Sequence, residues 1–127
     1  MSRSIEFKKE ECVLNLSGPA ALFSLKRKVR MPYKEIKSVF VDTFDPPFWM
    51  LRLPGTAIAP LYIYEGSYLY RNEWYFLSFE RRIPLFMVEF AGKSKYKYLV
   101  VQLENPKETA AELRRRIQKY EEENGVS

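Results

Sequence analysis

The sequence contains no histidine and a single cysteine, Cys12. One cysteine cannot form an intramolecular disulfide, and a lone thiol fits a reducing compartment. Zinc, copper and haem iron are held mainly by imidazole and thiolate groups, so we expect no metal site and no cofactor built by this chain alone. Histidine is also the commonest general acid and base. The sequence therefore predicts no catalytic residue and favours a protein that is not an enzyme.

Long apolar runs are also missing. No stretch approaches the roughly 20 apolar residues that cross a bilayer as a helix, and the charged residues 1–11 lack the apolar segment of a signal peptide. Only 5 glycines are present, and none belongs to a phosphate-binding glycine loop. We expect a cytoplasmic protein that, at most, associates with the surface of a membrane.

Aromatic residues, in contrast, are abundant: 9 Phe, 9 Tyr and 2 Trp among 127 residues. Aromatic side chains favour the half-buried, pleated surface of a β-sheet. The length and the hydrophobic content of 46% suit one domain, residues 1–127, with its core at about residues 5–120. The net charge of +5 is compatible with an acidic partner and equally with ordinary solubility.

A strand followed by an amphipathic helix is predicted for the last third of the chain. Leu99, Val101 and Leu103 alternate as in a half-buried strand, then Asn105 can cap a helix and Pro106 suits its first turn. The apolar stripe of this helix would consist of Ala110, Leu113, Ile117 and Tyr120. Short strands and turns are predicted before it, so we expect a mainly β fold, a barrel or a sandwich, with one C-terminal helix.

Three stretches in this order resemble the small prokaryotic members of the pleckstrin-homology (PH)-like family. They are a basic strand leading into Pro32 and residues 36–41, an Arg-x-Pro-Gly-Thr segment at 52–56, and residues 99–106. The resemblance implies two bent antiparallel sheets that pack orthogonally and are closed by the C-terminal helix. PH-like folds include phosphoinositide binders, peptide binders and scaffolds, and prokaryotic examples often form oligomers, so the resemblance implies binding without naming a ligand.

The densest positive cluster consists of Lys26, Arg27, Lys28 and Arg30. In lipid-binding PH domains, basic residues at this place grip inositol phosphates, so the resemblance implies an anionic headgroup here. Strand alternation places Lys26, Lys28 and Arg30 on one face and Arg27 on the other. A solvated edge strand that is protected from aggregation by its cations would show the same pattern, and this alternative stays open.

Residues 48–60 form an unusually apolar segment for a loop. Phe48, Trp49, Met50 and Leu53 either fold over the core or form a contact patch for another protein chain or for a membrane. Arg52, in the same segment, either pairs with a nearby acid or presents its guanidinium to an anion.

Binding or assembly through protein contacts, with self-association through residues 48–60, is the function that the sequence favours. Peripheral binding to an anionic membrane surface through the basic strand is the alternative. Aromatic and basic residues are interleaved at 64–71 and 93–98, but no RNP-like pattern is present, so nucleic acid is not an expected partner.

Overall fold

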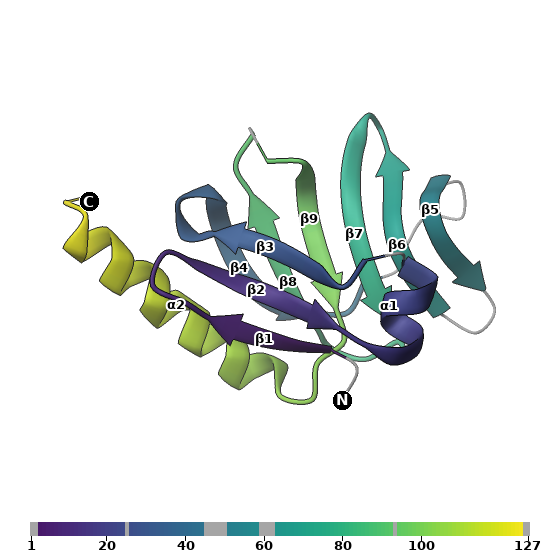
Figure 1. The fold of residues 1–127 in the computed structure, drawn as a ribbon, viewed down its shortest axis with the longest axis horizontal. Helices are drawn as coiled ribbons and strands as arrows, with labels where there is room; N and C mark the ends of the chain where they lie inside the picture. The colour runs from purple at the N-terminus through teal and green to yellow at the C-terminus, as the bar shows by residue number, and fades with distance from the viewer. Residues whose placement is uncertain (1–2, 25, 45–50, 59–62, 93, 126–127) are drawn as a thin grey trace.

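A computed structural model describes residues 3–24, 26–44, 51–58, 63–92 and 94–125, with only the backbone described at 22–23, 51–58 and 63. In these residues nine strands, two α-helices and a 3₁₀ turn follow one another (Figure 1). In chain order they are β1 (Arg3–Phe7), β2 (Glu11–Leu16), α1 (Gly18–Ser24), β3 (Lys28–Pro32), η1 (Tyr33–Glu35), β4 (Ile36–Asp42), β5 (Leu51–Ile58), β6 (Ile63–Tyr70), β7 (Glu73–Phe79), β8 (Leu85–Phe90), β9 (Tyr96–Val101) and α2 (Pro106–Glu123).

The strands form two sheets, a small one with the order β1-β2-β3 and a large one with the order β4-β8-β9-β7-β6-β5. In Figure 1 the strands of the small sheet run across those of the large sheet. The predicted mainly β fold with two sheets and one C-terminal helix is confirmed. The predicted barrel is wrong, because β4 and β5 are the two edges of the large sheet and no pairing between described strands closes it.

The prediction that both sheets are antiparallel is wrong at one pair of strands. β9 lies between β8 and β7; it is antiparallel to β8 and parallel to β7, with Tyr75 opposite Tyr98. The reason is that β8 pairs with β4 and β9, and not with β7, the strand before it in the chain. β9 therefore lies beside β7 and runs in the same direction. Alternating side chains identify strands in a sequence, but they do not tell which strands become neighbours.

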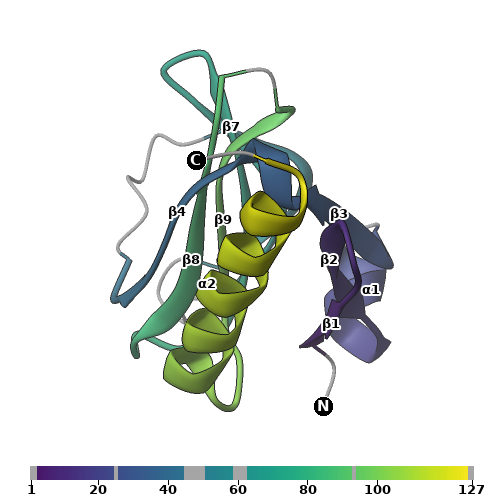
Figure 2. The same cartoon turned by 90° about the vertical axis from the view of Figure 1, so that its left-hand side faces the viewer.

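The main core lies between the two sheets, and α2 covers the same face of the large sheet beside the small sheet (Figure 2). The fully buried side chains that meet there include Leu14 and Met31 from the small sheet, Phe76, Phe86 and Leu99 from the large sheet, and Leu113 from α2. Each large apolar side chain buried in this way contributes about 1.5–3 kcal/mol to stability. We call this side of the large sheet its inner face.

The opposite, outer face of the large sheet is lined by aromatic rings. Tyr75 stacks on Tyr98 at 5.4 Å between ring centroids, and Phe44, which follows β4, lies 6.4 Å from Tyr75 and 6.3 Å from Phe79. These rings pack over the fully buried side chains of Leu77, Phe79, Leu85 and Val100. Part of the high aromatic content of the chain thus packs on this outer face of the large sheet.

The C-terminal helix is found where the sequence predicts it. Of its apolar stripe, Ala110 and Leu113 are buried, and Ile117 and Tyr120 pack against the main core. Asn105 occupies the N-cap position and Pro106 the first turn, as predicted, but the Asn105 side chain makes no capping hydrogen bond. Its carbonyl accepts a hydrogen bond from the Thr109 N–H at 3.0 Å.

Candidate functional site: a basic cleft between the sheets

The basic strand of the sequence is β3, the edge strand of the small sheet. Because side chains alternate along a strand, Val29 and Met31 enter the core while Lys28 and Arg30 remain exposed. The exposed side chains border a cleft of about 330 Å³ between β3 and the turn that joins β8 to β9. The residues that line it, which define the basic cleft, are Lys26, Lys28, Val29, Arg30, Glu35, Phe90, Ser94, Lys95 and Tyr96.

Three of these cations, Lys26, Lys28 and Lys95, have no acidic partner within 4 Å among the described residues. Other cations are paired: Arg30 lies 2.6 Å from Glu11, and Lys37 and Lys97 lie 3.7 and 3.6 Å from Glu89. Burial, and then the charge of Lys95, lower the pKa of Lys26. The basic cleft therefore gathers positive charge that the protein itself does not neutralise.

Hydrogen bonds between η1 and the β8–β9 turn hold the cleft together. The Ser94 hydroxyl donates to the Glu35 carboxylate at 2.9 Å, and the Ala91 N–H donates to the Glu35 carbonyl at 2.8 Å. These bonds fix the turn that carries Lys95 opposite β3. Glu35 is the one carboxylate among the lining residues, and the Ser94 bond already occupies one of its oxygens.

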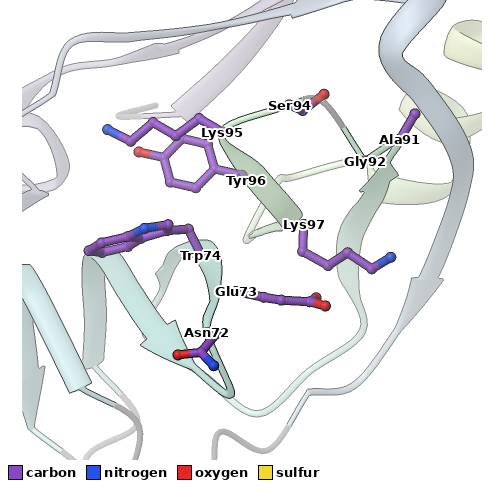
Figure 3. A pocket seen from close by; sticks show the side chains of 9 residues that line it. All are labelled: Asn72, Glu73, Trp74, Ala91, Gly92, Ser94, Lys95, Tyr96 and Lys97. Carbon is purple, nitrogen blue, oxygen red and sulfur yellow. The ribbon is translucent and has the colours of Figure 1, made fainter.

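A second pocket, of about 210 Å³, adjoins the basic cleft and shares Ser94, Lys95 and Tyr96 with it. Trp74 lines this tryptophan pocket, opposite Tyr96 in the parallel pairing of β7 and β9. In Figure 3 the side chains of Trp74, Tyr96 and Lys95 point to one side of the sheet, whereas those of Glu73 and Lys97 point away from them. The Lys95 ammonium lies 5.3 Å from the centre of the Tyr96 ring, so the shared wall combines a cation with an aromatic surface.

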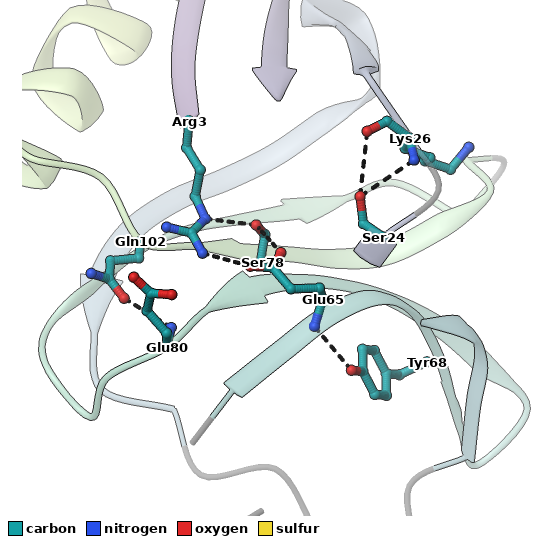
Figure 4. A network of polar contacts seen from close by, with 8 residues as sticks. All are labelled: Arg3, Ser24, Lys26, Glu65, Tyr68, Ser78, Glu80 and Gln102. Carbon is teal, nitrogen blue, oxygen red and sulfur yellow. Dashed lines mark hydrogen bonds and ion pairs between the residues drawn. The ribbon is translucent and has the colours of Figure 1, made fainter. Parts of the chain in front are cut away.

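Lys26 is positioned by the segment between α1 and β3. The buried Ser24 hydroxyl lies 3.3 Å from both the amide nitrogen and the carbonyl oxygen of Lys26, accepting from the first and donating to the second (Figure 4). These two bonds fix the backbone of Lys26 just before β3 begins.

The structure brings together three of the cations that the sequence singled out: Lys26, Lys28 and Arg30. Arg27 is exposed outside the lining of the cleft, and its carbonyl accepts a hydrogen bond from the Leu16 N–H at 2.7 Å. Arg52 lies on β5, which β6 and β7 separate from β9, and its side chain is outside the described residues.

The predicted protein interface falls largely outside the described part of the chain. Phe48, Trp49 and Met50 are not described, and Leu53 is described only as backbone in β5.

Sequence reasoning considered residues 93–98 only as a stretch of interleaved aromatic and basic residues, did not connect Lys95 and Ser94 with the basic strand, and did not single out Trp74. Residues 93–97 alternate lysine with Ser94 and Tyr96, a pattern that indicates a charged strand end. That signal does not show that the β8–β9 turn meets β3, because Pro32, which ends β3, and Ala91, which begins the turn, are 59 positions apart along the chain. Only the tertiary fold joins Lys95 to the basic strand.

Comparisons with known proteins give no match: no family model, no curated protein and no solved structure matches this chain. Within the described residues, no group of three or more His, Cys, Asp or Glu side chains could hold a metal ion. None of the helices in the described ranges is long and apolar enough to cross a membrane. The base of the basic cleft is formed by Val29, Phe90 and Tyr96. The ammonium and guanidinium groups around this base are of the kind that bind an anion.

A buried ion pair lies elsewhere between the sheets. Arg3 of β1 contacts Glu65 at 2.7 Å, its Nε donates to the Ser78 hydroxyl at 2.7 Å, and that hydroxyl donates to Glu65 at 2.6 Å (Figure 4). Burial raises the pKa of Glu65, and the hydrogen bonds from Ser78 and Arg3 oppose this rise. All three residues are at most 6% exposed, so this cluster joins β1 to β6 and β7 and offers no accessible site.

Proposed function

We propose that this chain is a binding module, and not an enzyme, whose ligand is an anion that carries phosphate and sits in the basic cleft. The observation that carries the proposal is the convergence of Lys26, Lys28 and Lys95 without acidic partners among the described residues. Like charges held together repel one another, and an anion placed between them removes the repulsion. Ammonium groups suit phosphate as point charges, and Arg30 could add a guanidinium if it leaves Glu11.

The phosphate could come from a lipid headgroup or from a free phosphate ester, because both present the same oxygens to the cleft. The lipid source corresponds to the peripheral membrane binding predicted from the sequence. The resemblance to PH-like domains supports it, and we propose a PH-like fold as well. Two crossing sheets and a C-terminal helix support this fold, while the parallel β7–β9 pair departs from the expected pattern.

Sedimentation with vesicles tests the proposal. Phosphatidylcholine vesicles with and without phosphatidylserine are compared at about 0.15 M salt, where exposed charges more than about 8 Å apart are largely screened. In parallel, calorimetry with pyrophosphate tests the free-phosphate source. We expect binding to at least one anion, and we expect Lys28→Glu/Lys95→Glu to weaken it at least about tenfold, since each lysine near an anionic surface contributes about 1 kcal/mol.

A matched control separates the site from net charge. Lys107→Glu/Lys119→Glu makes the same change of charge on the exposed side of α2, away from the basic cleft. Binding retained by this control and lost by the cleft variant supports the proposal. Equal weakening in both variants would mean general attraction to a basic protein, and no binding of either anion to the unaltered chain would overturn the proposal.

A further inference from the structure

The basic cleft and the tryptophan pocket are continuous, because Ser94, Lys95 and Tyr96 line both. We propose that the ligand is a nucleotide or a similar phosphate ester that carries a planar aromatic ring, with its phosphate at Lys26, Lys28 and Lys95 and its ring against Trp74. This inference rests on the proposed phosphate site and names the chemical class of the molecule that would fill it.

Trp74 is the reason to expect a ring. Its indole is half-buried against the core, and it has neither a hydrogen bond nor a ring contact within the described residues. An indole without a ring contact of its own presents a surface on which a nucleobase can stack, as aromatic side chains do in proteins that bind nucleic acids. In Figure 3 the indole points to the same side as Tyr96 and Lys95, so a molecule bound at Lys95 could reach it without crossing the sheet.

The remaining residues of the tryptophan pocket leave this path open. Glu73 and Lys97 point away from Trp74 in Figure 3, and Lys97 is engaged with Glu89 at 3.6 Å. On the side of the β8–β9 turn, Ala91 and Ser94 contribute only small side chains and Gly92 contributes none. The pocket is thus lined by the Trp74 indole, by the polar and charged residues Asn72, Glu73 and Lys97, and by small residues of the β8–β9 turn, which leave room for a flat group beside the indole.

A headgroup without an aromatic ring would use only the basic cleft. Adenosine 5′-monophosphate and ribose 5-phosphate are therefore the informative pair of probes, because they share a phosphate and a sugar and differ in the ring. Stacking of one base on one aromatic side chain should make the nucleotide bind roughly 5- to 160-fold more tightly than the sugar phosphate. Adenosine, which lacks the phosphate, should bind more weakly than the nucleotide.

Tryptophan fluorescence gives a direct readout of contact with Trp74. The chain has 2 tryptophans, so a Trp49→Phe background leaves Trp74 as the single tryptophan, whose emission is excited selectively at wavelengths that tyrosine does not absorb. In this background adenosine 5′-monophosphate should quench the emission and ribose 5-phosphate should not. Calorimetry with the same probes on the unaltered chain supplies the affinities.

Two variants assign the roles. Trp74→Leu should abolish the preference for the nucleotide while ribose 5-phosphate binds as before, and Trp74→Phe, the milder change, should keep part of the preference. Lys28→Glu/Lys95→Glu should weaken both probes alike. Because Trp74 packs partly against the core, circular dichroism accompanies each variant, and Trp74→Phe carries the test if Trp74→Leu does not fold.

The failures of the two proposals are distinguishable. Equal affinity for the nucleotide and the sugar phosphate would overturn the aromatic ligand and leave the phosphate site standing. A preference that persists in Trp74→Leu would overturn the role of Trp74. Absence of binding by every probe, together with absence of binding to anionic vesicles and pyrophosphate, would overturn the phosphate site itself.

Discussion

Cys12 illustrates how completely burial can change a single residue. Its side chain lies on the middle strand of the small sheet and is fully buried. Burial raises the pKa of Cys12 to about 12, with a smaller contribution from the charge of Glu11. Tyr33, whose hydroxyl donates to the Lys8 carbonyl at 2.6 Å, also has its pKa raised by burial, to about 12.

Stability should therefore fall in alkaline solution. Between about pH 9 and pH 12 the folded chain keeps protons on Cys12 and Tyr33 that the unfolded chain releases, so raising the pH favours unfolding. For Cys12 alone the free energy of unfolding should drop by about 2 kcal/mol from pH 8 to pH 10.5. Urea unfolding at a series of pH values measures this drop.

A Cys12→Ala variant is the control for the predicted loss of stability in alkaline solution. It is less stable at every pH because it leaves a cavity, but its loss of stability between pH 8 and pH 10.5 should be smaller than that of the unaltered chain. Parallel curves for the two proteins would show that Cys12 does not retain its proton in the folded state.

At the scale of elements, a buried ion pair between Arg3 and Glu65 joins β1 to the large sheet. Arg3→Met would leave the Glu65 carboxylate buried without its partner, and the free energy of unfolding should fall by about 3–5 kcal/mol. Arg3→Met/Glu65→Gln should recover part of this loss, because it removes the unpaired charge. Thermal unfolding followed by circular dichroism compares the variants.

The pH dependence of Arg3→Met separates a lost charge pair from lost packing. Without the guanidinium, Glu65 can avoid its unpaired charge by taking up a proton, so the variant should be least destabilised in mildly acidic solution. A destabilisation that is the same at neutral and mildly acidic pH would indicate that the packing of the Arg3 side chain, and not its charge, joins the sheets.

The sequence predicted individual strands and the helix better than it predicted which of these elements lie next to one another. The alternation around Val29 and the apolar stripe of α2 predicted β3 and the helix, because both signals lie within one short segment. The parallel pairing of β7 and β9 and the meeting of β3 with Lys95 depend on contacts between distant segments. For the same reason the sequence predicted the cations of β3 but not the lysine and the tryptophan that complete the two pockets.

For the whole molecule, the sequence favours self-association through an apolar segment. If Trp49 contributes to such an interface, the unaltered chain should elute as a species larger than 15.1 kDa in light scattering, and Trp49→Glu should shift it to the monomer. The oligomer should persist in high salt, because apolar contacts are not screened. An unaltered chain that is monomeric at high concentration would contradict this prediction, and Lys28→Glu serves as a control that changes charge without touching the segment.

The parallel pair of β7 and β9 also has a consequence for how the chain folds. β5, β6 and β7 pair with their sequence neighbours, as do β8 and β9, so each group can form locally and early. The large sheet becomes continuous only when β9 docks on β7, and Trp74 opposite Tyr96 is the first register pair of that joint. Because both pockets include residues at this joint, a bound ligand would favour the docked arrangement by mass action and so stabilise the junction that makes the large sheet continuous.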